Sequence, residues 1–124
     1  MTRPLALIFY ERLLPGSQLV NRLQDLGYRV QAVPVADLLT AEAEKEKPLL
    51  VFADLQTTGR NQPLAAVAAL KKNAATAHLP VVAFASEAQE ELQTEAVQAG
   101  AIAVGDIALL NHLPQLLDQA LQLD

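Results

Sequence analysis

A single carboxylate closes the most apolar stretch of the chain. Asp54 follows six apolar residues, 48–53, and polar residues begin soon after it. An apolar run without helical period predicts a strand that is buried on both faces of a parallel sheet. Asp54 would then lie at the carboxyl end of that strand, where ligands and chemistry collect in open α/β sheets. Asp54 is therefore a candidate functional residue. The alternative is that it only caps the following turn, as Asp often does.

Other chemistries lack the residues or the spacing that they need. The chain has no cysteine, which excludes disulfides, zinc-thiolate sites and thiol nucleophiles. His78 and His112 are far apart, and neither has a carboxylate at a ligand-like spacing. Residues 11–16 hold one glycine and no phosphate-binding glycine pattern. Ser17 and Ser86 lack the GxSxG context of a hydrolase nucleophile. We therefore do not expect an enzyme.

The position of Asp54 depends on a sheet, which the pattern of the chain predicts. Short apolar runs, typical of strands, alternate with helical patterns along the sequence. Ser17 is expected to be the N-cap of the first helix, and Gly27 suits the left-handed position after its end. The predicted strands cover residues 5–10, 28–33, 48–54, 79–85 and 101–104. The predicted helices cover residues 17–26, 37–46, 63–72, 87–99 and 111–124.

Five βα units with short connections require parallel pairing and right-handed crossovers. The predicted fold is an α/β, doubly wound, five-stranded parallel sheet in three layers, with flavodoxin-like order 2-1-3-4-5. With 124 residues, the chain is expected to form a single domain over 1–124.

Charge and hydropathy restrict the partners. The net charge is −5 at pH 7 and the pI is about 4.9, which argues against a nucleic-acid partner. The apolar runs are far shorter than the ~18 residues of a membrane helix, and no signal-peptide pattern follows Met1. We expect a cytoplasmic protein that binds neither nucleic acid nor membrane.

Three segments resemble the receiver (CheY-like) domain of two-component response regulators. Residues 48–55 are similar to its third strand, residues 69–84 to its third helix and fourth strand, and residues 98–101 to the turn into its fifth strand. The resemblance implies that Asp54 stands at the phosphoacceptor position. It also implies two acids after strand one, a Thr or Ser after strand four and a Lys after strand five. Together these groups offset the charge of a phosphoryl group and its Mg²⁺ ion.

The chain keeps only part of that set. The acid pair falls on Tyr10 and Glu11, and the lysine position falls on Ile107. Asp106 precedes Ile107 and would add repulsion, and no Lys or Arg follows Lys72. The sequence thus predicts no cation to offset Asp54, and Asp54→Asn is expected to be neutral or slightly stabilising.

The hydroxyl position falls on Ala85, with Ser86 directly after it. Ser86 is a possible hydroxyl substitute, or else the N-cap of a helix that begins at Glu87. A weak Mg²⁺ site would use Glu11, Asp54 and the backbone carbonyl of Gln56, and no other cofactor is expected.

The leading hypothesis is a pseudo-receiver, a signalling domain with a degenerate phosphorylation site that acts through protein–protein binding. Its partner face would comprise residues 87–106 and 111–124, with a sensor kinase or a second copy as possible partners. The alternatives are a working receiver phosphorylated on Asp54 with Mg²⁺ and, third, a small flavodoxin-like enzyme.

Overall fold

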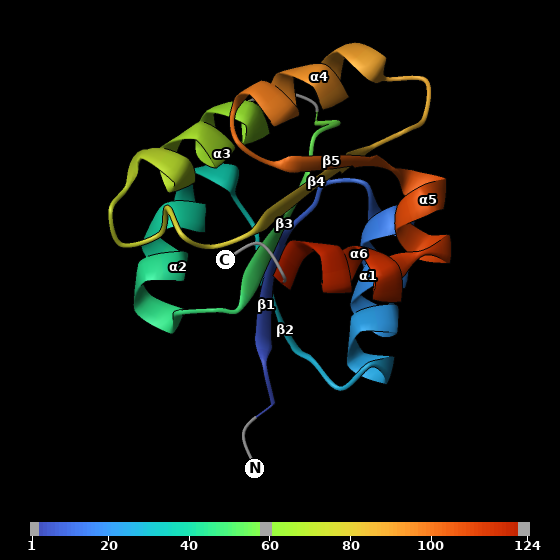
Figure 1. Ribbon diagram of the computed structural model, residues 1–124, viewed down its shortest axis with the longest axis horizontal. Coiled ribbons are helices and arrows are strands. Elements are labelled where there is room, and N and C mark those ends of the chain that lie inside the picture. The colour runs from blue at the N-terminus through green and yellow to red at the C-terminus, as the bar shows by residue number, and fades with distance from the viewer. Residues whose placement is uncertain (1–2, 58–60, 122–124) are drawn as a thin grey trace.

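A five-stranded parallel sheet forms the centre of the molecule (Figure 1). The computed structural model describes residues 3–57 and 61–121. The strand order is β2-β1-β3-β4-β5, so the predicted fold and order are confirmed. The strands are β1 (Leu5–Phe9), β2 (Arg29–Val33), β3 (Leu50–Asp54), β4 (Val81–Ala85) and β5 (Ile102–Gly105).

Helices cover both faces of the sheet. In Figure 1, α2 and α3 lie to the left of the sheet and α1, α5 and α6 to the right. The helices on one face are α2 (Leu39–Glu46), α3 (Pro63–Lys72) and α4 (Glu90–Gln98), with the short 3-10 helix η1 (Ala36–Leu38). Those on the other face are α1 (Leu13–Asp25), α5 (Asp106–Asn111) and α6 (Leu113–Leu121).

Strand residues alternate between two apolar cores. In β1, Leu7 and Phe9 pack into the core under α2, α3 and α4. Ile8 points into the core under α1, α5 and α6, together with the fully buried rings of Phe52 and Phe84. Because successive side chains of a strand point to opposite faces, an apolar run can fill both cores at once. This explains why β3 has no polar residue before Asp54 and β4 has none at all.

The start of α1 differs from the sequence prediction. The helix begins at Leu13 rather than after Ser17, and Arg12 is its N-cap residue. Gly16 therefore lies inside the first turns of α1, where it is buried. The ring of Tyr10 fills the space that a Cβ of Gly16 would need. The local Pro-Gly-Ser signal suggested a helix start, but contact between Tyr10 and a glycine inside the helix explains Gly16 better.

Two further boundaries also differ. Helix α4 begins at Glu90 rather than Glu87, and its N-cap residue Gln89 makes no side-chain capping bond. Ser86 is therefore not the N-cap; its Oγ accepts a bond of 3.3 Å from the Ala88 N–H in the preceding turn. Helix α5 was not predicted, because six residues are too few to show a helical period.

The expectation that Gly27 takes the left-handed position after the first helix was correct, and Gly100 does the same after α4. Gly27 has φ +94° and Gly100 has φ +106°, the left-handed conformation that suits the residue after a helix. Within residues 3–57 and 61–121, no helix has the length and apolar character needed to span a membrane.

Candidate functional site

Asp54 is the last residue of β3 and is fully buried. Its carboxylate accepts three backbone N–H bonds. Oδ2 accepts from Glu11 at 3.3 Å and from Arg12 at 3.1 Å, and Oδ1 accepts from Gln56 at 3.0 Å. Parallel pairing of β1 and β3 brings the loop after β1 over the end of β3. Asp54 lies at the carboxyl end of its strand, as predicted, and its hydrogen bonds join the loops after β1 and β3.

Arg12 supplies a cation to Asp54. Its Nη2 lies 2.8 Å from Oδ1 of Asp54, and its Nε donates to the same oxygen at 3.1 Å. The other side of the guanidinium binds Asp106, with Nη1 at 2.6 Å from Oδ2 and Nη2 at 3.1 Å from Oδ1. The expectation that the sequence places no cation near Asp54 is therefore wrong. The cation comes from the loop after β1, not from the loop after β5, where the receiver pattern has its lysine.

The position of Arg12 follows from three elements. As the N-cap residue of α1, Arg12 lies at the carboxyl edge of β1, next to β3. Asp106 begins α5 directly after β5, at the same edge of the sheet. The guanidinium also lies over the ring of Phe84, with 6.0 Å between Cζ and the ring centroid. Planar arginine suits this place because it can bind two carboxylates at once and stack on a ring.

The electrostatics of Arg12 are a balance of opposing effects. Burial alone lowers the pKa of the guanidinium, since it disfavours the charged form. The hydrogen bonds and negative charges of Asp106 and Asp54 outweigh burial, so the net pKa is above its ordinary value. Arg12 is thus a permanent cation between two acids. Asp106, which was expected to repel Asp54, binds the same cation as Asp54.

Glu11, which the sequence suggested as a Mg²⁺ ligand, binds the side chain of Asn61. Its Oε2 accepts a bond of 2.6 Å from the side-chain amide of Asn61. The Asn61 Oδ1 in turn accepts from the backbone N–H of Ala36, at 2.9 Å. Glu11 therefore connects the loop after β1 to the loops after β2 and β3.

The arrangement does not fit a Mg²⁺ ion on Asp54. Both oxygens of Asp54 accept N–H bonds, and a cation would have to displace the guanidinium of Arg12 from them. Within the described part of the chain, no three His, Cys, Asp or Glu residues form a group that could hold a metal. The weak Mg²⁺ site at Glu11, Asp54 and Gln56 stays a prediction, and it requires Arg12 to move.

Gln56 and Ser86 meet at the edge of the sheet, but not through the serine hydroxyl. The Ser86 backbone N–H donates to Oε1 of Gln56, at 2.5 Å. Among the described residues, no hydrogen bond joins the Ser86 hydroxyl to Asp54 or Arg12. Its role as a hydroxyl substitute remains a prediction.

Ile107, at the position where the receiver pattern has a lysine, is in contact with Glu87. The Ile107 side chain is 64% exposed. The backbone N–H groups of Ile107 and Ala108 both donate to Oε2 of Glu87, at 2.9 and 3.1 Å. Gly105 allows this contact, because a Cβ there would overlap the Glu87 carboxylate. An acid from the β4–α4 loop thus binds the start of α5.

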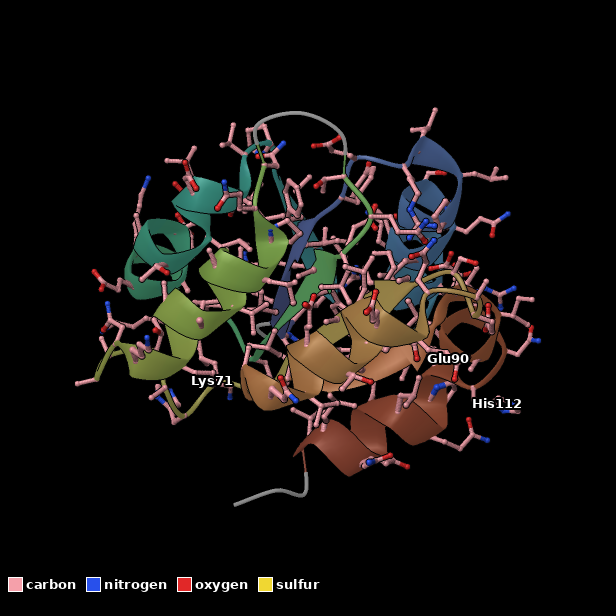
Figure 2. All side chains as sticks on the ribbon, turned by 90° about the horizontal axis from the view of Figure 1, so that it is seen from above. Lys71, Glu90 and His112 are labelled. Atoms are coloured by element: carbon pink, nitrogen blue, oxygen red, sulfur yellow. The ribbon has the colours of Figure 1, made fainter. Side chains whose placement is uncertain are left out.

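The remaining candidate residues lie outside this site. Figure 2 shows His112 at the outside of the molecule, with Lys71 on the opposite side of the view. His112 lies between α5 and α6 and is exposed, as is His78 in the loop before β4. The two histidines therefore contribute nothing to the chemistry at Asp54.

Comparisons with known proteins find similar folds. No family model matches the chain, and no curated protein matches it. A putative response regulator from Chloroflexus aurantiacus J-10-fl is 16% identical, with a TM-score of 0.87, over 98% of this chain and 99% of that one. The receiver domain of NtrX from Brucella abortus is 24% identical, with a TM-score of 0.83, over 96% of this chain and 99% of that one. CheY4 of Vibrio cholerae, a chemotaxis response regulator, is 19% identical, with a TM-score of 0.73, over 92% of this chain and 98% of that one.

These likenesses show that the chain has the fold of receiver domains. Each covers nearly the whole of both chains, so length and element order agree as well as topology. The fold therefore agrees with the resemblance that the sequence suggested, while the function has to be argued from the site.

Proposed function

We propose that this protein is a receiver-like signalling domain that binds a protein partner and does not use Asp54 as a phosphoacceptor. The Arg12–Asp54 ion pair carries the proposal. Phosphoryl transfer requires a donor and a hard cation to reach a carboxylate oxygen. Both oxygens of Asp54 already accept from Arg12, and the Asp54 side chain has no exposed surface.

Two other substitutions support the same conclusion. The first acid position is Tyr10, whose ring packs against Gly16 rather than binding an ion. The lysine position is Ile107, which is mostly exposed. A phosphoryl group at Asp54 would therefore lack a second loop acid for Mg²⁺ and an ammonium group for its oxygens.

The partner surface is proposed to be the α4, β5 and α5 side of the molecule, extended by α6. In receivers this side commonly binds partners, and the resemblance implies a sensor kinase or a second copy. Here the chain beyond Lys72 has acids and no Lys or Arg. Its α4 helix presents Val97, which is 57% exposed, among acidic and amide residues. An acidic surface with an exposed apolar residue favours a protein over nucleic acid.

The second candidate is a working receiver. In that case the phosphoryl group passes from a donor to an oxygen of Asp54, forming an acyl phosphate and releasing the donor's leaving group. Glu11, Asp54 and the Gln56 carbonyl would hold Mg²⁺, and Ser86 would offer a hydroxyl. The observation in its favour is the 27% exposure of the Arg12 side chain, a long chain that could swing outward.

The third candidate, a small flavodoxin-like enzyme, has less support. A surface pocket of about 540 Å³ lies between the loops after β3 and β4. Its described lining includes Gln56, Leu64, Gln89 and Leu92, and contains no acid or base. The one hydroxyl in that lining, of Thr57, donates to the carbonyl oxygen of Asn61 and has no base beside it in the lining.

The deciding experiment is incubation with acetyl phosphate and Mg²⁺, followed by intact mass spectrometry. An ordinary receiver treated in parallel shows that the conditions are sufficient. The wild-type protein should gain no stable phosphoryl adduct. An adduct that forms on the wild type and is lost in Asp54→Asn would overturn the proposal and establish the working receiver. An adduct that forms only after Arg12→Ala would support the proposal and identify Arg12 as the block.

A further inference from the structure

The loops around Asp54 are connected in a closed series of polar contacts, which we call the polar ring. Starting from Asp54, the ring passes through Arg12 to Asp106 at the start of α5. The next residue, Ile107, donates its N–H to Glu87 in the loop before α4. The residue before Glu87 is Ser86, whose N–H donates to Gln56. The Gln56 N–H returns to Asp54.

Four loops contribute to the polar ring. They follow β1, β3, β4 and β5, and all lie at the carboxyl edge of the sheet. The Asp54 side chain is fully buried, those of Arg12 and Asp106 are 27% and 18% exposed, and Glu87 is exposed. The strongest links are therefore the charged ones in the interior, and they lead outward to α5.

We propose that the polar ring is a built-in clasp that holds α5 and the loop before α4 in one arrangement, with the Arg12–Asp54 pair at its centre. The inference rests on the proposed function, because the surface that the ring connects to Asp54, through the fixed cation of Arg12, is the proposed partner surface. Asp106 and Glu87 are then positioning residues for that surface.

Two features of the sequence fit this arrangement. Asp106 stands at the first position of α5, where its carboxylate can bind Arg12 while its helix turns away from the sheet. Gly105 precedes it in extended backbone, with φ −80° and ψ 159°, a conformation that any residue adopts. A side chain at position 105 would meet Glu87. The glycine therefore leaves room for the flexible, exposed side chain of Glu87, and no backbone strain calls for it.

The test is amide hydrogen exchange followed by NMR in three variants. Arg12→Met removes the cation at the centre of the ring. Glu87→Gln weakens the bond at its far side, and Gly105→Ala displaces the Glu87 carboxylate while leaving its charge. Exchange at the Ile107 and Ala108 amides should quicken about tenfold in Arg12→Met, although Arg12 does not touch either amide. Glu95→Gln, an exposed substitution on α4, should leave these amides unchanged.

A second measurement makes the change at Gly105 and reads the effect at Arg12, and it decides the proposal if Arg12→Met does not fold. In Gly105→Ala, whose only forced change is at the exposed Glu87 side chain, the Nε–H resonance of Arg12 should shift and its exchange should quicken. A folded Arg12→Met with unchanged exchange at Ile107 and Ala108 would overturn the clasp. So would an unchanged Arg12 Nε–H in Gly105→Ala. Neither measurement uses phosphorylation. Hydrogen exchange can therefore overturn the clasp while the proposed function stands, and the acetyl phosphate assay can overturn the proposed function while the clasp stands.

Discussion

Arg12 and Asp54 form an ion pair of 2.8 Å between Nη2 and Oδ1, and the Asp54 side chain has no exposed surface. Taking a carboxylate out of water is costly unless a cation and hydrogen bonds satisfy its oxygens. Here the guanidinium and three backbone N–H groups do so. The two residues are 42 positions apart in the chain, so the pair also fixes the loop after β1 on the end of β3.

Asp54→Asn is expected to destabilise the protein, contrary to the expectation from the sequence. The substitution leaves the buried side of Arg12 unpaired and turns an amide NH₂ toward N–H donors. The free energy of unfolding should fall by about 2–3 kcal/mol, less than for a fully buried pair because Arg12 keeps Asp106. Urea unfolding at neutral pH measures it.

Asp106→Asn serves as the matched comparison, since it removes the other partner of Arg12 at a more exposed place. Its effect should be smaller, about 1 kcal/mol. If Asp54→Asn is as stable as the wild type, the stabilisation by the ion pair only offsets the free energy lost when the Asp54 carboxylate is buried.

The protein is expected to bind Mg²⁺ no more tightly than in the millimolar range. A magnesium ion needs near-octahedral oxygen ligands, and at Asp54 it would have to compete with a guanidinium that is already in place. Isothermal titration calorimetry measures the affinity. Micromolar binding that is abolished by Glu11→Gln would contradict this prediction and favour the working receiver.

Most of the fold could be predicted from the sequence because its strands are apolar runs separated by helical patterns. Five apolar runs alternating with helical patterns over short connections predicted parallel pairing and a flavodoxin-like order without any contact being known. Helix starts were less accurate. At α1 and α4, Ser17 and Ser86 carried a local capping signal that tertiary contacts overrode.

The centre of the site was predicted only in part. Asp54 was found because the end of a buried strand is visible in the sequence. Arg12 was missed because the search for a cation followed the receiver pattern to the loop after β5. The available signal was that Arg12 directly follows Glu11, at the same edge of the sheet as Asp54. Pairing across 42 positions is a tertiary property that local spacing cannot show.

Gly16→Ala is expected to destabilise the protein, although alanine normally favours a helix interior over glycine by about 1 kcal/mol. The added Cβ would overlap the ring of Tyr10, which packs on the first turns of α1. Such overpacking costs about 1–3 kcal/mol. Urea unfolding should show the loss. In a Tyr10→Ala background the same change should become neutral or stabilising, and a loss of equal size in both backgrounds would rule out the contact with Tyr10 as its cause.

Lys71 is expected to make stability rise with pH in the alkaline range. Its Nζ donates to the carbonyl oxygen of Leu79 at 2.7 Å, and burial lowers its pKa below the ordinary value of 10.5. Between the lowered pKa and 10.5, the unfolded chain holds a proton that the folded protein has lost. The free energy of unfolding therefore increases with pH in this window.

Lys71→Met keeps the aliphatic stem beside Gly100 and removes the titrating group. The free energy of unfolding of the wild type minus that of Lys71→Met, measured by urea unfolding, should rise across the window, because every other titrating group is common to both proteins. A flat or falling difference for Lys71→Met would show that burial of the ammonium group carries no such cost.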